Sequence, residues 1–190
     1  MKRSWGLRLL LYLWLAYVAV GLFFHPEFSG IFQGINWGAH ELGHYVVKPF
    51  TRTDWIRAAA GTVGQNVPIL ASFYFFMKQR DYFALSISSV WLGASLGHTG
   101  SYIASSLDDE VWTLKPVWAP EVEVYHDFNI ILDRFGVLEQ CKGIGQAVKI
   151  LSRIPLVAGL LWGAWVLWLM FTQRNGTEGR TVVEESGGDS

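Results

Sequence analysis

The sequence is poor in cysteine: Cys141 is the single one among 190 residues. One thiol cannot build an intrachain disulfide framework, and it cannot supply a cysteine-based zinc site. We therefore expect Cys141 to be a small buried or interfacial residue. Net charge is also low, with a formal value of −1, which argues against a nucleic-acid partner, because binding one would need a basic stripe. We find no internal repeats.

The first apolar run lacks a cleavage site. Lys2 and Arg3 precede residues 9–24, LLLYLWLAYVAVGLFF, in the order typical of a signal sequence. No small-x-small motif follows this run, and its residues are bulky and aromatic. These features favour a membrane anchor that is retained.

Apolar and aromatic residues are abundant. They make up 51% of the chain, with ten Trp, seven Tyr and twelve Phe. A bilayer crossing takes about 20 apolar residues. Five segments approach that length: 7–24, 30–47, 58–77, 82–107 and 154–173. We predict an all-α, polytopic membrane helix bundle with about four to six transmembrane or partly inserted helices.

The domain organisation follows from where the composition changes. Residues 1–174 are predicted to form a single membrane-embedded domain, and the polar, Gly-rich residues 175–190 a disordered tail. The acidic, Trp-bearing segment 108–125 is predicted to be a loop outside the membrane. By its position alone, it is a hypothetical lid or partner-docking element.

The segment 30–47 differs from the other four because it carries polar residues, among them Gln33 and Asn36. Its central motif is HELGH, with His40, Glu41 and His44. Polar groups at membrane depth usually face a bundle interior or a cavity. We therefore expect the other helices to surround this segment.

On a helix, His40 and His44 lie on one face and present two imidazoles to one point. Glu41 stands one residue along, within reach of a metal-bound water. This is the HExxH pattern of two zinc ligands and a general base, and it predicts a Zn²⁺ cofactor. Gly43, which has no side chain, would let a helix or a substrate come close. The alternative is a pair of hydrogen-bonded core histidines, but three ionisable groups in one turn are costly in a membrane without a metal.

A catalytic zinc normally has three protein ligands. The favoured third ligand is His126, at the start of an apparent amphipathic helix over 127–139. Asp127 beside it is a possible ligand, a helix cap, or a residue that orients a ligand. His98 and Asp133 are further alternatives.

The segment GTVGQNVP (61–68) follows the motif. Gly61 and Gly64 allow close helix approach. The amides of Gln65 and Asn66 could hold an extended substrate or stabilise an oxyanion, and Gln65 is the better candidate. Ordinary small-residue packing is the competing interpretation.

The motifs HELGHY, AAGTVGQNVPI and YHDFNIIL, in a hydrophobic chain, resemble those of the site-2-protease type of intramembrane zinc metalloprotease, the M50 peptidases. In that group the glutamate activates water, and the third ligand is usually an aspartate in an LDG-like motif. This chain has NIILDRFG (129–136), without a glycine directly after Asp133. It is therefore more similar to a small branch with a late His–Asp pair. The resemblance covers residues 36–139 and implies a multi-pass integral membrane protein, as in the bacterial cytoplasmic membrane.

We thus expect a membrane-embedded zinc metalloprotease, with zinc held by His40, His44 and His126 and with Glu41 as the general base. Its partners would be the lipid bilayer and a membrane-spanning or membrane-adjacent protein or peptide whose helix locally unwinds. Two rival functions are a zinc-dependent hydrolase of lipid amides or esters, and a non-enzymatic zinc-binding scaffold. Oligomeric state is not indicated by the sequence.

Overall fold

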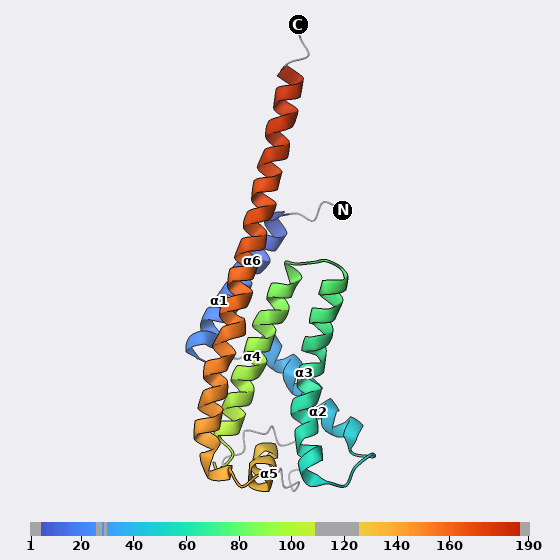
Figure 1. The fold of residues 1–190 in the computed structure, drawn as a ribbon, viewed down its shortest axis with the longest axis vertical. Coiled ribbons are helices and arrows are strands. Elements are labelled where there is room, and N and C mark those ends of the chain that lie inside the picture. Colours follow the sequence, from blue (N-terminus) through green and yellow to red (C-terminus); the bar gives the residue numbers. More distant parts are fainter. Residues whose placement is uncertain (1–4, 26–27, 29, 109–125, 187–190) are drawn as a thin grey trace.

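A computed structural model describes residues 5–25, 28, 30–108 and 126–186, with side chains described as far as residue 173. The secondary structure of these residues is helical and contains no strand, which confirms the all-α prediction (Figure 1). Of the predicted loop at 108–125, residues 109–125 lie outside the described residues. The elements in chain order are α1 (Trp5–Phe24), α2 (Ile31–Val47), α3 (Asp54–Lys78), α4 (Ala84–Ala104), α5 (Asp127–Arg134), the 3₁₀ helix η1 (Leu138–Gln140) and α6 (Cys141–Ser186).

The helices run between two ends of an elongated bundle. In Figure 1, α1 and α2 both descend, α3 returns upward, α4 descends, and α6 rises along α4. The start of α1 is tied to the α3–α4 turn, because Arg8 donates to both carboxylate oxygens of Asp81 at 3.1 Å. The start of α1 therefore shares one end of the bundle with that turn, and α5 lies at the other end.

Two helical stretches are long and apolar enough to cross a membrane. They are α1 and residues Leu138–Gln173, each with a mean hydropathy of 2.0 in its most apolar window. The other helices of the described part do not meet this criterion, so a polytopic bundle stays a prediction. The last helix begins at Cys141, well before the predicted start at residue 154, and continues to Ser186 through the segment whose composition predicts a disordered tail.

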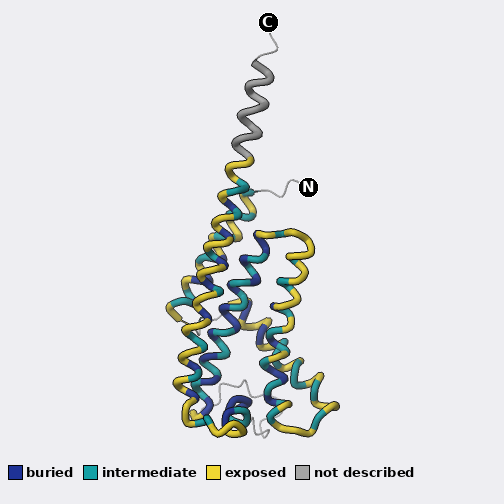
Figure 2. Tube along the Cα trace, viewed as in Figure 1, coloured by how far each residue is buried: buried dark blue, intermediate teal, exposed yellow. Residues whose placement is uncertain are grey.

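The main apolar core lies between α1, α4 and α6. It is built around residues that are almost fully enclosed, among them Leu15 of α1, Val90 and Ala94 of α4, and Leu156 of α6. A smaller cluster joins α5 to the end of α4 and includes Cys141, which is buried as predicted. Figure 2 shows this pattern as a buried line along α4, with exposed residues on the outer faces of α1 and α6.

The expectation that α2 would be enclosed on all sides is wrong. This helix packs mainly along α3, and Leu42 and Tyr45 on its other face are 61% and 74% exposed. The close approach of α3 leaves no room for side chains between the two helices beside His40 and His44. A Cβ on Gly64 would lie 2.7 Å from the Cα of Gly43, and one on Gly43 would collide with the carbonyl oxygen of Ala60. The predicted role of Gly43 and Gly64 in close helix approach is confirmed.

Candidate metal centre

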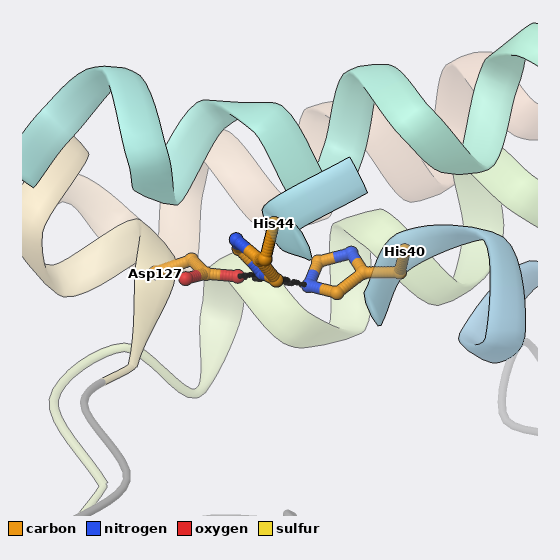
Figure 3. A group of neighbouring side chains, drawn as sticks. All are labelled: His40, His44 and Asp127. Carbon is orange, nitrogen blue, oxygen red and sulfur yellow. Dashed lines mark hydrogen bonds and ion pairs between the residues drawn. The ribbon is translucent and has the colours of Figure 1, made fainter. Parts of the chain in front are cut away.

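Three side chains converge between α2, α3 and α5 (Figure 3). His40 Nε2 lies 2.8 Å from Asp127 Oδ2, and His44 Nε2 lies 3.1 Å from the same oxygen. The two Nε2 atoms are 3.1 Å apart. The side chains are largely buried, with 12% of His40, 27% of His44 and 12% of Asp127 exposed. Three donor atoms thus point at one small volume from two segments far apart in the sequence.

The helical repeat and a glycine shape this volume. His40 and His44 are one helical turn apart on α2, and Asp127 is the first residue of α5. Gly61 of α3 forms one wall of this volume, against the donor atoms: a Cβ there would lie 2.5 Å from Nε2 of both histidines. The predicted close approach at Gly61 is therefore confirmed, and the tight contact is with the two imidazoles rather than with a helix backbone.

The group fits a metal ion by donor type and spacing. In tetrahedral coordination with bonds of about 2.0–2.1 Å, ligand atoms lie about 3.3 Å apart. The three donors are a few tenths of an ångström closer than that, so a small outward rotation would admit an ion. His44 Nδ1 lies 2.8 Å from the carbonyl oxygen of Arg57 and donates to it, which leaves the Nε2 lone pair directed at the group. His40, His44 and Asp127 could hold a metal ion.

Asp127 supplies the negative charge of the group. Burial by itself would raise the pKa of its carboxyl, but the neighbouring imidazoles of His40 and His44 outweigh burial and hold the pKa below its ordinary value. The carboxylate is therefore ionised at neutral pH, the form that binds a cation.

His126, the favoured third ligand, does not join the group. Its ring stacks on Tyr102 with centroids 4.0 Å apart, and its Nε2 faces Ser105 Oγ at 3.2 Å. Burial lowers the pKa of His126, so the imidazole is neutral there. Consecutive side chains at a helix start point in different directions, so only one of this pair can face α2. The structure places Asp127 in that position, where the sequence favoured His126.

Glu41 lies at the edge of the group and is exposed. Together with His40 it lines a cavity of about 590 Å³ between α2, α3, α4 and α6. Lys142 and Lys149 of α6 lie on its wall as well. Through this cavity, a water molecule or an extended ligand can reach the carboxylate of Glu41, which lies beside the group of His40, His44 and Asp127.

Gln65 and Asn66 are separated by the structure. Gln65 lines the cavity, and its Nε2 donates to Ser95 Oγ at 2.9 Å and to Thr99 Oγ1 at 2.8 Å. Ser95 Oγ in turn donates to Asn66 Oδ1 at 3.2 Å, while Asn66 Nδ2 donates to Thr62. Both polar atoms of the Asn66 amide are therefore hydrogen-bonded to neighbouring helix residues. The Oε1 atom of Gln65 has no donor among the described residues and is available to a ligand.

The remaining sequence candidates fall elsewhere. His98 lines the cavity but lies outside the donor group, and Asp133 is exposed on α5. The sequence interpretation missed Tyr102, which also lines the cavity and contacts the group. A usable signal was present, since polar residues recur on α4 at spacings of three and four, from Ser95 to Ser105.

Comparison with known proteins gives no relative. No protein-family model, curated protein or solved structure matches the chain. The HELGH motif and the geometry around it are therefore the basis for assigning a function.

Proposed function

We propose that the protein is a membrane-embedded zinc metalloprotease. The observation that carries this proposal is the convergence of His40, His44 and Asp127 beside Glu41, which is exposed and lines a cavity. A structural or scaffold site has no need of a free carboxylate next to its ligands, whereas hydrolysis requires a base there. This position of Glu41 favours an enzyme over a scaffold.

Two imidazoles and one carboxylate form a donor set known from catalytic zinc, with a fourth position left for water or substrate. A zinc ion bound there would polarise a carbonyl and bring the pKa of water down to about 7. Asp127 brings a negative charge to the set and has the aspartate identity usual for the third ligand in site-2 proteases. It fills this role from the YHDF segment, whereas Asp133 of the LDG-like segment lies exposed outside the group.

Glu41 and Gln65 have separate roles in the proposed reaction, proton transfer and substrate binding. Glu41 accepts a proton from the attacking water and returns it to the leaving nitrogen as the C–N bond breaks. Gln65 offers its Oε1, which has no donor in the described part of the chain, to an N–H group of the substrate, and this suits an extended peptide. An ester lacks the N–H at the scissile bond, so this acceptor favours amides over lipid esters.

The outer surface supports a location in lipid. Large apolar side chains are exposed on α1, α2, α3 and α6, including Leu7 at 70%, Tyr74 at 69% and Leu161 at 67%. An apolar surface of this extent is unfavourable in water and suits a bilayer. Arg57 and Gly61, which contact the donor group, lie within two turns of the start of α3 at Asp54. The site is thus near one end of the bundle, where water and a locally unwound helix end can enter.

The test compares wild-type protein with Glu41→Gln in liposomes that contain the same membrane-protein extract. We expect new peptide termini, quantified by mass spectrometry, with the wild type only, while both proteins hold about one zinc per chain by metal analysis. Lipid analysis of the same samples addresses the alternative hydrolase. New lipid products without new peptide termini, or equal peptide cleavage by Glu41→Gln, contradict the proposal.

A further inference from the structure

Tyr102 of α4 is held rigidly beside the donor group. Its ring stacks on His126 with centroids 4.0 Å apart and an interplanar angle of 26°. It meets Phe128 edge-on at 5.6 Å and His40 edge-on at 6.1 Å. Aromatic neighbours on several sides leave the ring little freedom to rotate away.

The phenol oxygen of Tyr102 is adjacent to a proposed ligand. It accepts the backbone N–H of Asp127 at 3.3 Å. Its own proton goes to no acceptor in the described part of the chain. Tyr102 also lines the cavity together with His40 and Glu41. A positioned hydroxyl donor therefore remains unused next to the place where a scissile carbonyl would bind.

We propose that Tyr102 is a catalytic residue that donates its O–H to the carbonyl oxygen of the substrate as negative charge develops there. This inference rests on the proposed hydrolytic function. Water oxygen bonds to the carbonyl carbon, the C=O π pair moves onto the oxygen, and Glu41 takes the water proton. The Tyr102 proton is shared with the oxyanion and is not transferred. When the C=O bond re-forms, the C–N bond breaks and nitrogen receives the proton from Glu41.

The surroundings of Tyr102 suit this role. An oxyanion donor is effective when it is already in place, since no reorganisation is then needed as charge develops. The Asp127 N–H both holds the phenol oxygen and withdraws electron density from it, which strengthens the remaining O–H as a donor. The fixed ring and this backbone contact together supply that preorganisation.

The test is Tyr102→Phe, which keeps the ring packing and removes only the hydroxyl. Tyr45→Phe, on the exposed face of α2, is the matched control. With a peptide cleaved by the wild type, we expect kcat of Tyr102→Phe to fall about 100- to 1,000-fold, with KM and zinc content unchanged. Unchanged kcat overturns the proposal. A fall in zinc content that accounts for the fall in kcat also overturns it, because Tyr102 would then only position Asp127.

A second readout does not depend on turnover. Acetohydroxamic acid is titrated into the cobalt-substituted wild type and Tyr102→Phe, and its binding is followed in the visible spectrum. We expect roughly tenfold weaker binding to Tyr102→Phe, because the hydroxamate oxygen loses a donor. Equal affinity overturns the role of Tyr102. If no peptide is cleaved by the wild type, the proposed protease function fails, and this titration still decides whether Tyr102 donates to an oxygen at the metal.

Discussion

Two helix pairs in this protein approach closely through glycine, yet they bury opposite chemistry. Between α4 and α6, a Cβ on Gly145 would lie 2.5 Å from the carbonyl oxygen of Gly100, and the buried cluster beside this contact contains apolar residues such as Ile103 and Cys141. Between α2 and α3, Gly43 and Gly64 allow a similar approach, but the enclosed side chains are the two histidines beside Gly61. Glycine spacing therefore indicates where helices touch, and the flanking side chains decide whether the contact is a core or a site.

The largest expected effect comes from removing the acidic donor of the α2–α3 site. We expect Asp127→Asn to lower zinc affinity more than 100-fold, above the range for a residue that only orients a ligand, and to lower peptide cleavage to background. Zinc content and cleavage rates provide the measurement. His126→Phe is the matched control, because it keeps the ring against Tyr102 and leaves the donors in place. If His126→Phe empties the site and Asp127→Asn does not, His126 is the ligand.

A smaller effect is expected from filling the wall of the site. Gly61→Ala places a methyl group 2.5 Å from both imidazole Nε2 atoms, so the histidines must move. We expect zinc affinity to fall about tenfold or more while the helical circular dichroism is retained. Gly38→Ala on α2, where a Cβ has no neighbour within 4 Å, should bind zinc like the wild type. Equal zinc affinity in the two variants would show that Gly61 does not shape the site.

The smallest expected effect on the site comes from the α4–α6 pair. Gly145→Ala forces a methyl group against the backbone of Gly100 and should lower the free energy of unfolding by about 1–3 kcal/mol. Zinc content of the folded fraction should stay the same. Gly143→Ala, on the same helix with no neighbour within 4 Å, should be neutral or slightly stabilising. Denaturant titration in detergent measures both, and loss of zinc from folded Gly145→Ala would show that the two regions are coupled.

The sequence predicted the helices better than it predicted their surroundings. Apolar runs located α1 to α4 to within a few residues, because charged and turn-forming residues interrupt the chain between these runs. The predicted enclosure of α2 was wrong. Its buried polar residues lie on one face, toward α3, α4 and α5, so Leu42 and Tyr45 remain exposed on the other.

The candidate site was predictable where its residues are close in the chain. His40 and His44 share a face through the helical repeat alone, so their convergence followed from the HELGH spacing. The choice between His126 and Asp127 did not follow from the sequence. His126 is the N-cap of α5 and Asp127 is its first residue, so the two differ mainly in the direction of their side chains. Tyr102 was missed because its relation to Asp127 joins α4 to α5 across the bundle.

The sequence by itself therefore determined that this protein is helical, that runs such as 7–24 and 154–173 are apolar enough for a membrane, and that two imidazoles and Glu41 stand together on one turn. Local periodicity and composition are sufficient for each of these properties. Only the tertiary structure decided that Asp127 completes the donor group, that Gly61 lies against the imidazoles and that Tyr102 contacts Asp127. The reason is physical: contacts between α2, α3, α4 and α5 depend on how closely and at what rotation the helices pack, which no local pattern in the chain encodes.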